Sequence, residues 1–345
     1  MIELKDNTLA ISFPELPLQP RLTIDFQRTL RIPDDGRDYP LPPGFGSFPL
    51  HHIDDYAGRV PASWLDRGGI LLPMWQAEAL WLNFDSPDLD DRESPYPFAL
   101  KIATGKISAL TGDPWQRGLH RNPQDYLVVP EQPWLDGYCV EKGIIRQFVA
   151  MPLGEGYTAE EQLTGKAEFG GMQIEIFPMR PEIFAKRFPR IERRAEVDYA
   201  AGEYPELSAC GAPAPMGLAP GGRMRQEIYE DPFSIHDWDT QHTSRCFIHI
   251  VNSSTWQALT GQRPPSLPLT AQDYTRAGYP WFDYYDSELT AINGSNTLAD
   301  LKSVAAMAKE KRANPLPENA TVPVTNIINL RAGLKPHQVR EPQQF

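Results

Sequence analysis

Two histidines and two aspartates stand close together in "HDWDTQH", residues 236–242. Imidazole and carboxylate groups bind divalent metals, and they are also common general acids and bases. His236, Asp237, Asp239 and His242 could therefore hold a metal that lowers the pKa of a bound water, while a carboxylate takes the proton. A site of this kind would belong to a metal-dependent hydrolase or to another small-ligand enzyme.

A metal centre in this stretch would need further ligands from elsewhere in the chain. His249 in the next apolar run is one candidate, and His51 and His52 in "LHHIDDY" are others. None of these residues has the spacing of a known zinc motif such as HExxH. The alternative is a hydrogen-bonded loop that leads into a buried strand. We therefore predict no cofactor, with a divalent metal as the alternative.

A second candidate site is the aromatic cluster "GYPWFDYYD", residues 278–286. Aromatic side chains next to carboxylates can pack in a core, anchor a protein interface or stack on sugar rings. All three interpretations are open at this stage. The residues that would form an interface or a ligand platform are Tyr279, Trp281, Phe282, Tyr284 and Tyr285.

The elements that position these residues are predicted to be short. The chain has 35 prolines among 345 residues, about twice the usual ~5%, and proline interrupts helices. Alternating and apolar runs predict strands at 125–130, 144–151, 172–177 and 245–251. Residues 69–84 should form a turn of helix that enters a buried strand. A short helix should follow Thr270 and stop at Gly278, and a C-terminal helix, capped by Thr297, should cover 298–312.

These patterns predict an α+β fold with predominantly antiparallel strands, short capped helices and long proline-rich loops. Residues 1–50 should form strands and an extended proline-rich arm, and residues 51–199 a strand-rich body. The composition of residues 200–232, rich in proline and glycine, is typical of a linker or a long loop. Residues 233–345 form the C-terminal part, with a polar tail, packed on the body as one compact unit.

Charge and hydropathy exclude several classes of protein. Lysine and arginine number 33 against 45 acidic residues, giving a net charge of −12, which repels nucleic-acid backbones. No apolar run approaches the ~20 residues of a membrane helix, and no secretory signal is recognisable at the N-terminus. We expect a soluble cytoplasmic protein that neither binds nucleic acid nor inserts into a membrane.

Several long strings resemble a family of uncharacterised bacterial and fungal proteins, some of them labelled integral membrane protein. The resemblance covers most of the chain and implies no catalytic residues. The membrane label conflicts with the absence of a sufficiently long apolar run. The strings are "RTLRIPDDGRDYPLPPGFGSFPLHHIDDY", "MWQAEALWLNF", "DYLVVPEQPWLDG", "IIRQFVAMPLGEGYTAEEQLTG", "GYPWFDYYD" and "LKSVAAMAKEKRANPLPEN".

The function favoured by these patterns is noncatalytic interaction or self-assembly, since no catalytic signature is found. The arm "DYPLPPGFGSFPL", residues 38–50, is suited to reach a neighbour, and the aromatic cluster is suited to anchor one. The partner would be a second copy of the chain, in a homo-oligomer, or another protein. The alternatives are the metal-dependent hydrolase or small-ligand enzyme at residues 236–242, and a carbohydrate-binding module that uses aromatic residues 279–285.

Overall fold

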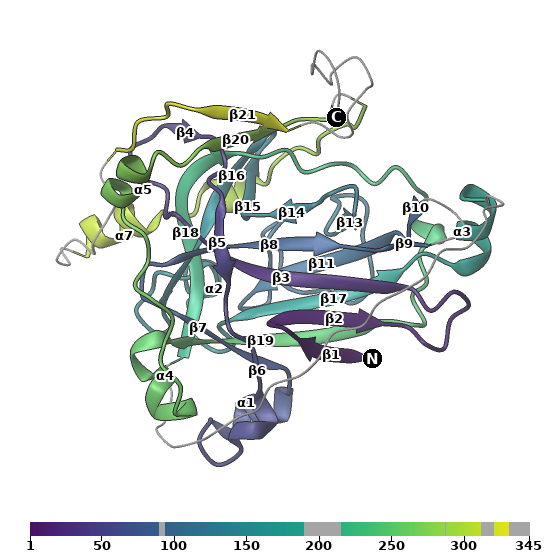
Figure 1. Cartoon of the computed structure of the whole chain (residues 1–345), viewed down its shortest axis with the longest axis horizontal. Coiled ribbons are helices and arrows are strands. Elements are labelled where there is room, and N and C mark those ends of the chain that lie inside the picture. Colours follow the sequence, from purple (N-terminus) through teal and green to yellow (C-terminus); the bar gives the residue numbers. More distant parts are fainter. Residues whose placement is uncertain (90–93, 190–214, 287, 312–320, 331–345) are drawn as a thin grey trace, which may run out of the picture.

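Antiparallel strands make up most of the regular secondary structure of the protein (Figure 1). The computed structural model describes residues 1–89, 94–189, 215–286, 288–311 and 321–330. Hydrogen bonds link seventeen strands of this part into one sheet. They are β1 (Ile2–Lys5), β2 (Thr8–Ser12), β3 (Arg21–Thr29), β4 (Asp38–Tyr39), β5 (Gly44–Ser47), β6 (His51–His52), β7 (Ile70–Met74), β8 (Ala79–Asp85), β11 (Phe98–Thr104), β12 (Ile107–Ser108), β13 (Leu127–Val129), β14 (Trp134–Leu135), β15 (Gly137–Glu141), β16 (Ile144–Pro152), β17 (Met172–Pro178), β18 (Pro215–Arg225) and β19 (Ser244–Asn252).

The pairing of the long strands confirms the predicted α+β class with predominantly antiparallel strands. Strand β8 pairs with β3, β14 and β16, β16 pairs with β18, and β17 lies between β11 and β19. All of these pairs are antiparallel, whereas β4 with β18 and β7 with β19 are parallel. Alternating apolar residues of these strands, such as Leu22, Ile24 and Phe26 of β3, are fully buried and form the core.

Short helices lie around the sheet (Figure 1), and they are the short capped helices that the sequence predicts. Helix α2 has the capping box of Thr158 and Glu161, and Thr270 caps α5. In the described ranges, no helix is long and apolar enough to cross a membrane. The helices are α1 (Ala62–Arg67), α2 (Ala159–Thr164), α3 (Pro181–Arg187), α4 (Ser253–Thr260), α5 (Ala271–Ala277), α6 (Asn296–Ala299) and α7 (Val304–Glu310), with the 3-10 turns η1 (Ile53–Tyr56) and η2 (Ile235–Asp237).

The predicted C-terminal helix at 298–312 is two helices in the structure. Ser295, not Thr297, caps α6, and Ser303 caps α7 by accepting a hydrogen bond from the backbone N–H of Ala306. The backbone of Ser303 is extended, with ψ of 163°, so a helix cannot continue through it. Residue 312 lies outside the described residues. Periodicity alone therefore predicted one helix, whereas two serine caps begin two separate helices.

Two further predictions about local structure are corrected. Residues 69–84 contain no helix, because strands β7 and β8 follow each other across a tight turn. Of the predicted linker, residues 200–214 lie outside the described part, but 215–225 form the long strand β18 in the middle of the sheet. Its glycines permit close contact: a Cβ on Gly222 would lie 2.5 Å from the carbonyl oxygen of Pro33.

The proline-rich arm crosses the body of its own chain. Strand β4 pairs with β18, and β5 pairs with β3. Beyond β4, Leu41 exchanges two backbone hydrogen bonds, each of 2.8 Å, with Phe282. Phe282 belongs to β20 (Trp281–Tyr284), which pairs in parallel with β21 (Ile327–Leu330). We call β20 and β21 the surface ribbon; it lies at the top of Figure 1. Strands β9 (Asp88–Leu89) and β10 (Ser94–Pro95) form a separate small hairpin.

Candidate functional site

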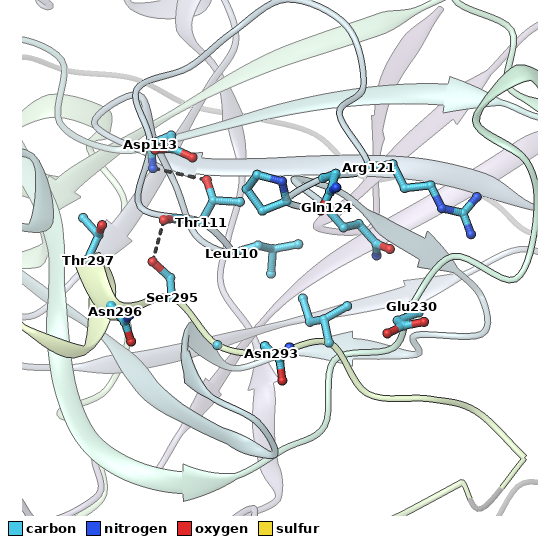
Figure 2. Close-up of a pocket in the computed structure, with 14 residues that line it drawn as sticks. Leu110, Thr111, Asp113, Arg121, Gln124, Glu230, Asn293, Ser295, Asn296 and Thr297 are labelled. Atoms are coloured by element: carbon cyan, nitrogen blue, oxygen red, sulfur yellow. Dashed lines mark hydrogen bonds between the residues drawn. The ribbon is translucent and has the colours of Figure 1, made fainter.

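One hollow of the described part of the chain is a polar groove of about 730 Å³. Figure 2 shows loop residues facing one another across it, with Leu110, Thr111 and Gln124 on one side and Asn293 and Ser295 on the other. Ser295 donates a hydrogen bond to the carbonyl oxygen of Thr111, which ties the two loops together (Figure 2). Many of the lining side chains are exposed, among them Asp113, Arg121, Glu230, Asn293, Asn296 and Thr297.

A smaller hollow of about 220 Å³ adjoins the groove and contains a buried ion pair. The ammonium of Lys101 lies 2.7 Å from Oδ2 of Asp125 and donates to the carbonyl oxygens of Gln116 and Gly118. The same carboxylate oxygen is 2.9 Å from Nδ1 of His120. Since all three protons of the ammonium have acceptors, Lys101 is a structural cation that fixes Asp125 and, through it, the ring of His120.

A third hollow, which we call the aromatic pocket, lies between the sheet, the arm and the surface ribbon. It has a volume of about 220 Å³. The rings of Trp81 and Trp134 meet edge to face, with centroids 6.5 Å apart and planes at 74°. Apolar groups make up most of the wall. The lining residues are Leu41, Pro42, Pro43, Gly44, Trp81, Trp134, Asp136, Phe282 and Leu330.

The carboxyl group of Asp136 is the ionisable group of the aromatic pocket. Asp136 lies between β14 and β15 and is 2% exposed. Among the described residues, only Gln226 hydrogen-bonds to its side chain, with Nε2 2.8 Å from Oδ2. Burial disfavours the charged form and raises the pKa of Asp136 to about 7. The pocket therefore contains a carboxyl group that changes charge near neutral pH.

A second polar group of the pocket wall lacks a partner. The indole Nε1 of Trp81 is buried, and no acceptor for it is found in the described part of the chain. A buried unpaired donor is costly in a folded protein. Gly44 lies against the same ring, since a Cβ at this position would come 3.1 Å from Cζ2 of Trp81. A larger residue at position 44 would crowd that ring and the side chain of Gln27.

The stretch 236–242 forms a hydrogen-bonded loop and not a strand. Asp237 is buried and completes the capping box of the turn η2 by accepting from the backbone N–H of the N-cap residue Ser234; it also pairs with Arg187 at 2.8 Å. Asp239 accepts from two backbone N–H groups and lies 2.8 Å from Nδ1 of His242. His236 is exposed. Both carboxylates therefore hold the loop together.

His249, the third candidate metal ligand, lies elsewhere in the core. Its ring stacks between Trp64 and Phe247, with centroids 4.7 and 4.6 Å away, and Nε2 is 3.0 Å from the carbonyl oxygen of Gly68. Burial lowers the pKa of His249 to about 4. His51 contacts Tyr56. The described residues contain no group of three or more histidine, cysteine or acidic side chains placed to bind a metal.

The aromatic cluster divides into a buried part and an exposed part. Trp281 is 1% exposed and packs on Tyr39 and Tyr274, so it is not accessible to a partner or a ligand. Phe282 lines the aromatic pocket, and the ring of Tyr284 packs on Trp134 with centroids 5.0 Å apart. The exposed members are Tyr279 and Tyr285.

Sequence patterns missed the residues of the aromatic pocket other than Phe282. Asp136 stands in "PWLDGYC", where a single acidic residue is surrounded by apolar and aromatic residues. That context was the available signal, because a carboxyl group in an apolar strand region must be buried or must face a ligand. Comparison of the chain with protein-family models, curated proteins and solved structures finds no match. The function of the protein must therefore be inferred from the geometry of its structure.

Proposed function

We propose that the protein binds a small, largely apolar molecule in the aromatic pocket. The observation that carries this proposal is a carboxyl group, 2% exposed, in the wall of a cavity otherwise lined mainly by aromatic rings, prolines and leucines. Ligand sites typically combine an apolar wall with a few convergent polar groups and a perturbed pKa. The cavity of about 220 Å³ is smaller than the ~300–1,000 Å³ of drug-sized sites, so the ligand is small.

The polar groove supports ligand binding less well. Its charged residues are exposed, and the guanidinium of Arg121 donates to the backbone carbonyl oxygens of Asp231 and Phe233. In the adjoining hollow, Lys101 has no proton left for a ligand. By contrast, the buried groups of the aromatic pocket, the carboxyl of Asp136 and the indole N–H of Trp81, retain unused hydrogen-bonding capacity.

A fragment screen by saturation-transfer NMR tests the proposal. The wild-type protein is compared with Trp134→Leu, which removes one wall of the pocket, and with Trp115→Leu, which changes another half-buried tryptophan outside the pocket. We expect apolar fragments that bind the wild type and Trp115→Leu but not Trp134→Leu. If no fragment distinguishes Trp134→Leu from the other two proteins, the aromatic pocket is not the binding site.

Self-association through the surface ribbon is a second candidate, and a separate observation favours it. Tyr285 is 60% exposed and Ile327 and Ile328 are 41% and 42% exposed. Among the described residues, β21 pairs only with β20. An exposed apolar edge strand is a surface on which chains commonly pair. The buried Trp281 takes no part in this candidate interface, which consists instead of the exposed Tyr285, Ile327 and Ile328.

Light scattering measures this second candidate directly. Ile328→Glu places a charge on the ribbon and should reduce the mass of the assembly, because a buried unpaired charge at an interface is unfavourable. Val324→Glu, at a similarly exposed residue outside the strands, separates an effect of strand pairing from a general effect of charge. An equal mass for the wild type and Ile328→Glu at all concentrations would contradict self-association through the ribbon.

A further inference from the structure

We infer that the ligand of the aromatic pocket is a small alkylammonium ion, held by the carboxylate of Asp136 and the faces of the surrounding aromatic rings. The inference deepens the proposed function and rests on it. It names a ligand class for the pocket from two properties of its wall, which are uncompensated negative charge and the arrangement of the indoles.

The wall of the pocket contains a carboxyl group that no cation neutralises among the described residues. Asp136 is nearly completely buried, and the amide of Gln226 is its only side-chain partner within the described ranges. Two other buried carboxylates have a cation: Glu78 has Arg28 at 2.6 Å and Asp125 has Lys101 at 2.7 Å. A buried charge without a counter-ion is costly. A cationic ligand would supply the counter-ion that this pocket lacks.

The aromatic rings are the second feature of this wall. Trp81 and Trp134 stand at 74° to each other, and Phe282 lines the same cavity. Tyr284 does not line the cavity but packs on the ring of Trp134. Ring faces attract cations, tryptophan most strongly, and cages of such rings together with a carboxylate suit alkylated ammonium groups. A bare ammonium is strongly hydrated, whereas an alkylated one presents an apolar surface to prolines and leucines.

The simplest available probe of this ligand class is choline, a small quaternary alkylammonium ion. Its methyl groups surround the positive charge with apolar surface, so it combines the two properties that the pocket wall would recognise. The indole N–H of Trp81 is buried beyond the reach of a water-sized molecule, and it therefore adds no preference.

The test is calorimetric titration of the full chain at pH about 8 with choline and with 3,3-dimethylbutan-1-ol, which has the same shape without the charge. We expect choline to bind at least about tenfold more tightly than the neutral alcohol, the scale of a desolvated cation–aromatic contact. Asp136→Asn, which keeps the shape and the Gln226 contact, should reduce the affinity for choline and leave that for the alcohol unchanged. Asp113→Asn, at an exposed carboxylate of the polar groove, is the control and should change neither.

The other outcomes overturn the inference in distinguishable ways. Equal affinity for choline and the alcohol, unaffected by Asp136→Asn, would show that the pocket binds apolar molecules without regard to charge. The proposed function would then stand and the ligand class would be wrong. If neither compound binds and the fragment screen also fails, both proposals are wrong. Because the comparison of the two ligands is made on the wild type, it does not depend on the folding of any variant.

Discussion

Replacing Asp136 with asparagine should stabilise the protein, and should do so only above acidic pH. Asparagine has the shape of the protonated aspartic acid and cannot ionise. The two hydrogen bonds to Gln226, from Nε2 to Oδ2 and from the backbone N–H of residue 136 to Oε1, can both be kept. The variant therefore removes a buried ionisable group without leaving a cavity.

The size of the effect follows from the pKa. Burial raises the pKa of Asp136 from 3.8 to about 7, so between these values the folded protein holds a proton that the unfolded chain has lost. Stability must then fall as the pH rises through this window. At ~1.4 kcal/mol for each pKa unit, the full loss is about 4 kcal/mol. More than half of it, about 3 kcal/mol, falls between about pH 5 and about pH 8.

Urea denaturation of the wild type and of Asp136→Asn at these two pH values measures the effect. Taking the difference between the two proteins removes the contribution of all other titrating groups. We expect the stability of the variant relative to the wild type to rise by about 3 kcal/mol between about pH 5 and about pH 8. The exposed Asp113→Asn should show no such rise. A stability difference that is the same at both pH values would refute the assignment of a desolvated carboxyl to Asp136.

Three further predictions concern the fold. His249 has a pKa lowered from 6.5 to about 4, so as the pH falls the unfolded chain takes up a proton before the folded protein does. The free energy of unfolding of the wild type should therefore decrease by about 3 kcal/mol between about pH 6.5 and about pH 4. Urea denaturation at these two pH values should show that His249→Gln lacks this decrease. A Cβ on Gly137 would lie 2.0 Å from the carbonyl oxygen of Arg146, so Gly137→Ala should cost about 3 kcal/mol or more. At Gly118 an added Cβ would meet open space, so Gly118→Ala should cost only about 1 kcal/mol of backbone strain. Thermal unfolding of the two glycine variants and the wild type measures both costs. Thr158→Ala removes a helix cap and should cost about 1 kcal/mol of unfolding free energy; no loss would contradict the capping role.

The candidate site could be predicted only in fragments. Phe282 belonged to a cluster that the sequence marked as a possible ligand platform, and it does line the aromatic pocket. Trp281, two positions after Tyr279 in the same cluster, is buried in the core. Composition cannot distinguish these outcomes, because the same aromatic residue suits a core, an interface or a ligand site. The residue types in "HDWDTQH" likewise suited a metal site, yet its carboxylates accept hydrogen bonds from their own loop.

Local interactions are what the sequence determined by itself. Alternating apolar residues specified strands such as β3, β17 and β19, and short-range hydrogen bonds specified the caps at Thr158 and Thr270, because these depend on neighbours a few residues away. The tertiary structure alone decided that 215–225 is a central strand, where its glycines allow close packing against distant segments. It also decided the pKa of Asp136, since desolvation depends on how deeply the folded chain buries the carboxyl group.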